Sequence, residues 1–496
     1  MKINNKNHID FAQKGCVKQP QEIIVGGMFV LSIVALWAVL GIVTTLIFTA
    51  EQMYVIVPLL AAVAIFIIFS YVLWFRTGAL IFGEIGFIYL VFALAYTILP
   101  SITFLTINFD FPIGFDNLNF SILSPQPEEL GAHCWRHFLF IFGVATGYIA
   151  VRGGTMPTMP LHENSMSRDS QIVAVMSLIT IFCVISVSLL SSPVATYWDH
   201  YSRFDHLSWS LRRFVYLCLI FKNGSYFILM TLMFRQYQKY RIIIFIIVPI
   251  ICIYETVYSF GSRIETLTLL LAFIGFYHFK VNPISLKKGI LYLLFLAILF
   301  TGIELIRSSD NSFEIAKNAV ATEGIKSASE FGAIYYTGFH LYAERDQGNI
   351  PPRDWQMFFY EFISLIPFLD HTAYHPQYWY ARHYFPNAIV PPQTMGVIVD
   401  SAIWGGEFDL FIRSLINGAL FAMLTRWFLA HRNKWWACTI YIYWYATCVM
   451  TLKYSVLYQL IPFTRILIPV LLCTGILFLL QKNLMSLKSV CNETVD

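Results

Sequence analysis

Four arginines lie at or inside apolar runs of the chain, where a charged side chain is costly. Arg263 opens the run "RIETLTLLLAFIGFYHFK", Arg307 follows another run, and Arg413 and Arg465 lie about seven and eight residues inside theirs. An arginine within a membrane helix costs about 2.5–3.5 kcal/mol on insertion scales, so such residues usually face a cavity and serve function. A guanidinium stays charged and binds phosphate oxygens through parallel hydrogen bonds. The pattern therefore predicts that these four arginines bind a phosphate group.

The alternative role for each arginine is an ion pair with a local acid. Glu304 precedes Arg307 by one helical turn and could neutralise it. Arg263 has Glu265 close by in sequence, but residues two apart on a helix point to different sides. We therefore expect the partner of Arg263 to come from another helix or from a substrate.

Three acids lie close together in the stretch "VIVDSAIWGGEFDLFIRS", namely Asp400, Glu407 and Asp409. A half-buried carboxylate has a raised pKa and can serve as a general base. The Gly405-Gly406 pair allows the backbone to turn or to approach another group closely. We take Asp400 and Glu407 as candidate catalytic residues. The alternative, that these acids are counter-ions for arginines, is expected to hold for at least two of the three.

The histidines give a weaker signal. His340 and Glu344 have i,i+4 spacing, which makes His340 a third candidate for acid–base catalysis. Two histidine pairs have the same spacing and could hold a metal: His133 with His137, and His371 with His375. Two ligands are too few without a third, so no metal and no cofactor are predicted. Nine cysteines occur without a CxxC pair, which indicates neither a zinc site nor a disulfide framework.

These residues must be positioned by helices in a membrane. The 496-residue chain is 57% hydrophobic and only 12% charged, whereas a soluble domain carries about 25% charged residues. The sequence predicts an all-α polytopic membrane protein with about 12 transmembrane helices. The spans are expected near residues 23–48, 54–75, 80–103, 133–151, 170–191, 214–234, 241–258, 264–280, 288–306, 406–428, 435–452 and 457–480.

The expected organisation has five parts. Residues 1–22 form a polar N-terminus, and 23–306 hold the first nine spans, the first of them uncleaved. Residues 307–395 form a large, partly helical loop, whose stretches "IYYTGFHLYAE" and "WQMFFYEFISLIPFL" mix aromatics and acids at near-helical spacing. Residues 396–481 return into the membrane and complete spans ten to twelve, and 482–496 form the C-terminus. The loop is either a lid over a binding site or a packed cap without chemistry.

Charge sets the expected orientation. With the N-terminus in the cytoplasm, every cytoplasmic segment contains lysine or arginine, and most acids fall on the other side. Both termini are then cytoplasmic and the large loop is external. The net charge of +4 and the scattered cations give no basic patch for nucleic acid. External aromatics in "YHPQYWYARHYFP" are a candidate platform for sugar rings, with interfacial packing as the alternative.

At these residues the chain resembles the bacterial O-antigen polymerase (Wzy) family of oligosaccharide repeat-unit polymerases. The first shared feature is a span opening with Gly-Ser-Arg, here "FGSRIETLTLLLAF"; the second is a large periplasmic loop before the last three of twelve spans. The third is an acid followed by a glycine turn and a glycine-bearing helix, here "PPQTMGVIVDSAIWGGEFDLFIRSLINGALFAML". The family usually has glutamate where Asp400 stands, and its paired Arg-x10-Gly loop motifs are not evident.

The resemblance implies a GT-C-like, metal-independent membrane glycosyltransferase of the bacterial inner membrane. It would transfer a glycan chain from undecaprenyl pyrophosphate onto a new lipid-linked repeat unit at the periplasmic face. The phosphate group bound by Arg263, Arg307, Arg413 and Arg465 would then be that pyrophosphate. Implied partners are the undecaprenyl-pyrophosphate-linked oligosaccharide, membrane lipid and a chain-length regulator protein. Two alternatives stay open: an O-antigen ligase that transfers to lipid A core, and a lipid-linked oligosaccharide flippase without catalysis. A flippase would be expected to show two similar halves, and no internal repeat is visible.

Overall fold

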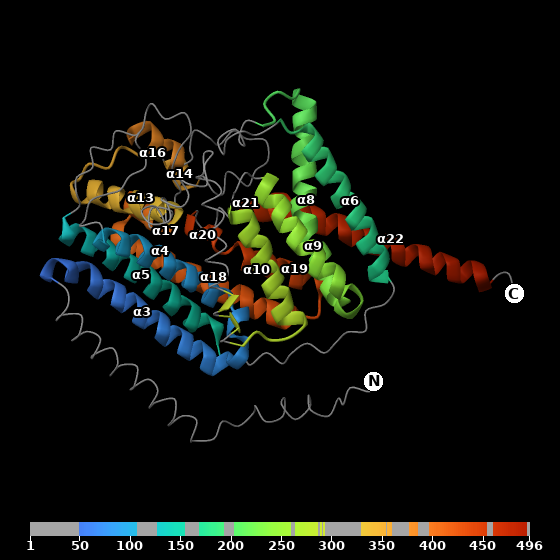
Figure 1. Ribbon diagram of the computed structural model, residues 1–496, viewed down its shortest axis with the longest axis horizontal. Coiled ribbons are helices and arrows are strands. Elements are labelled where there is room, and N and C mark those ends of the chain that lie inside the picture. The colour runs from blue at the N-terminus through green and yellow to red at the C-terminus, as the bar shows by residue number, and fades with distance from the viewer. Residues whose placement is uncertain are drawn as a thin grey trace, which may run out of the picture.

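The computed structural model describes residues 49–106, 126–153, 168–192, 203–258, 263–285, 288–289, 291–292, 329–353, 355–359, 376–384, 396–453 and 460–493. Every regular element in these ranges is helical (Figure 1). The elements are α3 (Ala50–Thr77), η1 (Gly78–Gly83), α4 (Ile85–Thr106), α5 (Pro127–Arg152), α6 (Arg168–Leu190), α8 (Trp209–Arg235), α9 (Tyr237–Tyr258), α10 (Arg263–Lys280), α13 (Ser329–Asp346), α14 (Trp355–Phe358), α16 (Pro376–Tyr384), α17 (Val397–Ile403), α18 (Gly406–His431), α19 (Trp435–Thr447), α20 (Met450–Lys453), α21 (Leu460–Pro462), the π-helical turn η4 (Phe463–Leu467) and α22 (Ile468–Glu493).

Seven of the helices are long and apolar enough to cross a membrane: they lie in α3, α4, α5, α6, α8, α18 and the run from α21 into α22. The shorter stretch Thr266–Lys280 of α10 is also apolar. This arrangement is that of a multi-pass membrane protein, as the composition predicts. The expected spans 23–48 and most of 288–306 lie outside the described residues. The span expected near 435–452 is interrupted by a turn between α19 and α20.

The helices that carry the candidate site are held together by close backbone packing. In α5, a Cβ added at Gly147 would meet the carbonyl of Leu415, and one at Gly418 of α18 would meet the carbonyl of Val144. A Cβ added at Gly143 would lie 2.7 Å from the Cβ of Ser414. Small residues let membrane helices approach closely enough for strong van der Waals packing. Glycines therefore bring α5 and α18, far apart in sequence, into direct contact.

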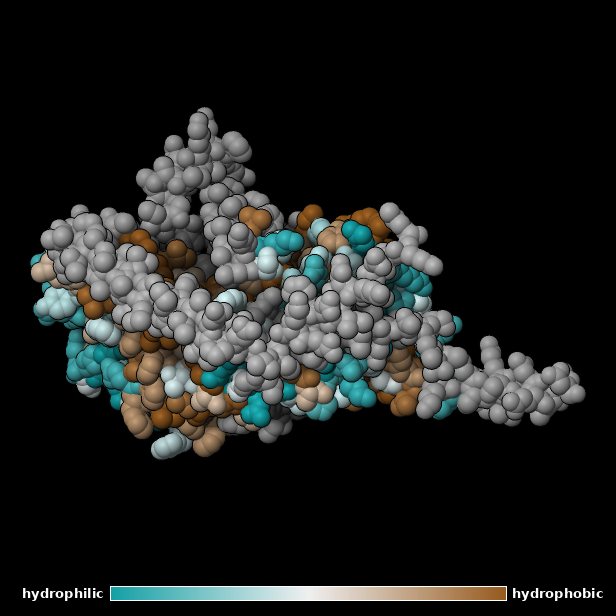
Figure 2. Space-filling view, turned by 90° about the horizontal axis from the view of Figure 1, so that it is seen from below, coloured by the Kyte–Doolittle hydropathy of each residue, from teal (hydrophilic) through white to brown (hydrophobic). Residues whose placement is uncertain are grey.

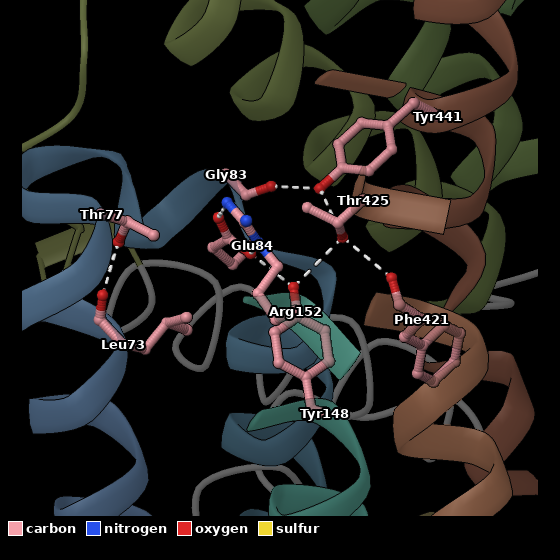
Figure 3. A network of polar contacts seen from close by, with 9 residues as sticks. All are labelled: Leu73, Thr77, Gly83, Glu84, Tyr148, Arg152, Phe421, Thr425 and Tyr441. Atoms are coloured by element: carbon pink, nitrogen blue, oxygen red, sulfur yellow. Dashed lines mark hydrogen bonds and ion pairs between the residues drawn. The ribbon is translucent and has the colours of Figure 1, made fainter. Parts of the chain in front are cut away.

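A buried network of charged and polar side chains connects α5 and α18 near the C-terminal end of α5 (Figure 3). Arg152, at the end of α5, donates two hydrogen bonds to the Glu84 carboxylate, at 2.7 and 2.8 Å. The Tyr148 hydroxyl donates to the same carboxylate at 2.5 Å and lies 3.1 Å from Thr425 of α18. Both charged side chains are almost fully buried. A buried ion pair is tolerated only when the partners satisfy each other, so this network aligns α4, α5 and α18.

Within the segment 307–395, the described residues form α13, α14 and α16, and residues 347–353 between the first two are not helical. Figure 1 shows α13, α14 and α16 grouped at the upper left, beside α17 and the ends of α4 and α5. Tyr335 of α13 packs between His133 and His137 of α5, with ring centroids 4.5 and 4.8 Å away. His137 Nδ1 lies 3.0 Å from the Thr97 hydroxyl of α4. His133 and His137 thus connect α13, which belongs to the predicted loop, with the membrane helices α4 and α5.

The right-hand part of the molecule in Figure 1 consists of α6, α8, α9, α10, α19 and α22. Of these, α22 extends beyond the others toward the C-terminus. Lys222 of α8 donates to Glu255 of α9 at 2.9 Å, and both are buried. On the side shown in Figure 2, hydrophobic side chains gather at the lower left of the described surface, and hydrophilic ones lie at the left-hand end and in smaller groups elsewhere. Exposed apolar side chains are expected where lipid is the solvent.

Candidate active site

The site lies at the turn between α17 and α18. All seven residues of α17 are buried. Gly406 has a φ of +69°, a left-handed conformation that a side chain disfavours, and a Cβ there would lie 2.9 Å from Nε of Arg345. The predicted role of the glycine pair, a turn with close approach, is confirmed at Gly406. The turn separates α17 from α18, and the absence of a side chain at Gly406 lets the Arg345 guanidinium approach the backbone there.

Asp400 occupies the middle of α17 and is 7% exposed. Burial raises the pKa of its carboxyl to about 7, against the opposing effect of Arg413 and with a further increase from Asp409. Among the described residues no cation forms an ion pair with this carboxylate. A buried carboxylate whose pKa lies near neutrality is suited to accept a proton.

The other two acids pair with arginines. Asp409 accepts a hydrogen bond from Nε of Arg413 at 2.7 Å, one turn further along α18. Glu407 accepts one from Nε of Arg136 on α5, also at 2.7 Å. Arg136 reaches a second carboxylate as well, that of Asp346 on α13, at 2.9 Å. The counter-ion role expected for at least two of the three acids is confirmed for these two.

Two arginines from the loop hold the end of α17. Arg345 of α13 donates to the carbonyls of Ala402 and Trp404 at 3.0 and 3.3 Å. Arg353 donates to the carbonyl of Ile403 and, at 3.3 Å, to that of Trp404. The last carbonyls of a helix have no partner within the helix and carry partial negative charge, so cations there are favourable. The loop thereby holds in place the short helix that carries Asp400.

Aromatic rings border the same turn. The Trp404 ring lies 5.2 Å from Phe358 and 6.1 Å from Trp355 of α14, between centroids. The guanidinium of Arg413 lies 5.7 Å from the Phe358 ring centroid. Trp355 and Phe358 are 73% and 41% exposed. The cations of the site therefore adjoin an accessible aromatic surface, made by a stretch upstream of the one proposed from sequence.

His340 lies beside this site rather than at Asp400. Its Nδ1 is 2.9 Å from the hydroxyl of Tyr380 on α16, and its Nε2 is 3.8 Å from Glu344. Burial lowers the pKa of the imidazole to about 4, so His340 is neutral near pH 7. A base of so low a pKa is weaker than Asp400. The geometry therefore favours the aspartate.

The predicted pyrophosphate-binding arginines are only partly described. Arg413 belongs to the site. Arg465 lies in η4, which packs against α8: a Cβ at Gly224 would approach the Ile466 carbonyl at 2.9 Å. Arg263 is the first residue of α10, but its side chain lies outside the described residues, as do Arg307 in full and the pair His371 and His375. Whether the four meet stays a prediction. Among the described residues no three metal-ligating side chains cluster.

Sequence reasoning overlooked three arginines of the site. The sequence predicts no function for Arg136, Arg345 or Arg353, although all three lie outside the segments expected to be cytoplasmic. Each of them contacts α17 or α18 from more than 40 positions away in sequence. The residues next to each arginine in the sequence do not indicate these long-range contacts. The position of Arg136 at the external end of an expected span was the one available signal.

Comparison with known proteins gives no assignment: no family model, no curated protein and no solved structure matches this chain. Fold and site therefore define the class on their own. The molecule is a multi-pass helical membrane protein. Its candidate site consists of the buried carboxyl of Asp400, with its pKa raised to about 7, next to a group of arginines and aromatic rings.

Proposed function

We propose that this protein is a membrane glycosyltransferase of the oligosaccharide repeat-unit polymerase class. The observation that carries the proposal is Asp400, a buried carboxyl with a pKa of about 7, held in a short helix that loop arginines cap. It occupies the place of the acid in the O-antigen polymerase motif. The expected twelve spans, with both termini in the cytoplasm of a bacterial inner membrane, belong to the same proposal.

The reaction assigned to the site is glycan transfer to a hydroxyl. Asp400 takes the proton of the acceptor hydroxyl, whose oxygen forms a bond to the anomeric carbon of the donor glycan. The bond between that carbon and the pyrophosphate oxygen breaks, and its electron pair leaves on undecaprenyl pyrophosphate. Glu407 and His340 remain secondary candidates for the base, since the first is paired with Arg136 and the second has a pKa of about 4.

Arginines are proposed to neutralise the leaving pyrophosphate. Arg413 supports this role because it lies beside Asp400, close enough to influence its pKa, with part of its side chain exposed. Arg263, Arg307 and Arg465 complete the proposed set. Preorganised cations stabilise the negative charge that develops on the leaving group where water is excluded. In this scheme the arginines take the place of a metal ion. Partners are the lipid-linked oligosaccharide, membrane lipid and a chain-length regulator protein.

The experiment is the lipopolysaccharide ladder of a strain that lacks the protein. A polymerase role predicts lipid A core capped with a single repeat unit, and return of the ladder when the wild-type chain is supplied. Uncapped core with polymer retained on the carrier would instead identify a ligase. Loss of all periplasmic repeat units would identify a flippase. An unchanged ladder would contradict all three.

A further inference from the structure

An apolar groove lies among helices other than α17 and α18, and none of its lining residues has a role in the proposed transfer reaction. Its volume is about 270 Å³, and its walls come from α6, α8, α9 and α10. The α9 wall uses Tyr240, Ile243, Ile244, Ile247, Val248 and Ile251, which share one helix face. Ile243 and Ile247 are 42% and 39% exposed, whereas Ile244 and Val248 are buried. The groove is thus open along one side of α9.

The length of the groove matches one leaflet of a bilayer. From Tyr240 to Ile251 the groove follows eleven residues of α9, or about 16 Å at 1.5 Å per residue. The hydrocarbon core of a bilayer is roughly 30 Å thick. An acyl chain that starts at the interface would therefore fill the groove and end near the midplane.

One end of the groove carries hydrogen-bond donors. This end lies at the turn between α8 and α9, where Lys239 donates to the Ser170 hydroxyl at 2.7 Å. Ser170 donates in turn to the amide oxygen of Gln236 at 3.1 Å. The amide nitrogen of Gln236 is buried and has no acceptor among the described residues. Among the residues that the structure describes, no carboxylate forms an ion pair with Lys239. An oxygen-rich anion would satisfy both donors.

We propose that the groove binds an anionic phospholipid, with an acyl chain along α9 and the headgroup phosphate at Lys239. The aliphatic walls fit the chain, the leaflet-long groove fits its length, and the cationic end fits the phosphate. Basic residues between membrane helices are a known mode of binding anionic headgroups. The site is independent of the proposed transfer reaction, since none of its residues belongs to α17 or α18.

Native mass spectrometry of the detergent-purified full chain tests this proposal, with phosphatidylglycerol and phosphatidylcholine added in equal amounts. Wild-type protein should retain one phosphatidylglycerol in preference to phosphatidylcholine. Lys239→Gln should reduce that preference about fivefold, the effect of one basic residue near an anionic headgroup. Ile247→Trp, which fills the groove, should abolish retention of both lipids.

Matched controls separate the groove from the general surface. Arg241→Gln removes an exposed cation two residues away, and Ile246→Trp adds bulk at a side chain that is 54% exposed and outside the groove. Both should retain lipid as the wild type does. Equal retention of the two lipids by the wild type, or an equal loss in Lys239→Gln and Arg241→Gln, would overturn the proposal. Full retention by a folded Ile247→Trp protein would also overturn it.

Discussion

At the scale of single residues, the three acids around the turn between α17 and α18 lie in different environments. Glu407 and Asp409 each receive an arginine nitrogen at 2.7 Å, while Asp400 is enclosed in α17. Pairing favours the charged form of a carboxyl and burial favours the neutral form. The protonated and ionised forms of Asp400 are therefore close in free energy near neutral pH, which a proton acceptor requires.

Asp400→Asn should lower turnover about 10²–10⁴-fold, because the amide keeps the shape and cannot take a proton. The wild-type rate should rise with pH through about 7 and then level off. Initial rates of glycan transfer in reconstituted vesicles between pH 5 and 9 measure both effects. Glu407→Gln is the control and should keep the pH profile. Wild-type turnover by Asp400→Asn would transfer the role of base to another residue.

Stability should change in the opposite direction to activity. Native Asp400 has its pKa raised to about 7 from 3.8, so between these values the folded state holds a proton that the unfolded state has lost. The free energy of unfolding therefore falls as pH rises from about 4 through 7. In the asparagine variant this decrease is absent, so its melting temperature at pH 8 should not fall below that of the wild type.

At the scale of elements, the sequence predicted helices well and their junctions poorly. Long apolar runs gave α3, α5, α6, α8 and α18 because hydrophobicity over about 20 residues is a strong signal. The break between α19 and α20 was missed, since neither glycine nor proline marks it. The hydrogen bonds from Arg345 and Arg353 to α17 were also missed, because they depend on tertiary contacts that helical spacing does not encode.

The glycine contact between α5 and α18 makes a sharp test at this scale. Gly418→Ala should lower stability by about 1–3 kcal/mol, because its Cβ would lie 2.8 Å from the Tyr148 backbone nitrogen and backbone cannot yield as a side chain does. Gly475→Ala is the matched control, since nothing lies within 4 Å of its Cβ. It should raise stability slightly through helix propensity. Thermal unfolding in detergent measures both, and equal effects would argue against tight packing at Gly418.

At the scale of the whole molecule, the multi-pass class follows from composition, whereas orientation rests on charge. Most lysines and arginines fall on the side assigned to the cytoplasm. The proposed polymerase function is predicted less strongly than the multi-pass class. Its motifs cover only short stretches, and the roles proposed for Arg263 and Arg307 depend on contacts between distant parts of the chain. Asp400 could be proposed from the sequence because its motif, unlike those contacts, is local.

Orientation can be measured with single cysteines in a cysteine-free background. A cysteine at position 326 should react with an impermeant thiol reagent in intact spheroplasts, and one at position 434 should react only after the membrane is opened. The reason is that 326 lies in the predicted external loop and 434 in a lysine-bearing cytoplasmic turn. Labelling at 434 but not at 326 would reverse the orientation and remove the site from the periplasm.

The pairing of α5 with α18 imposes an order in time on the making of this protein. Arg136 and its partner Glu407 are 271 positions apart, a distance that a ribosome covers in some tens of seconds at about 5–20 residues per second. During that interval α5 sits in the bilayer with its glycine face and its arginine unmatched. This surface of α5 is covered by α18 only once residue 418 has entered the membrane. A chain that ends before residue 396 lacks both α17 and α18, so its α5 would keep this surface, and Arg136, without the partners that the full chain provides.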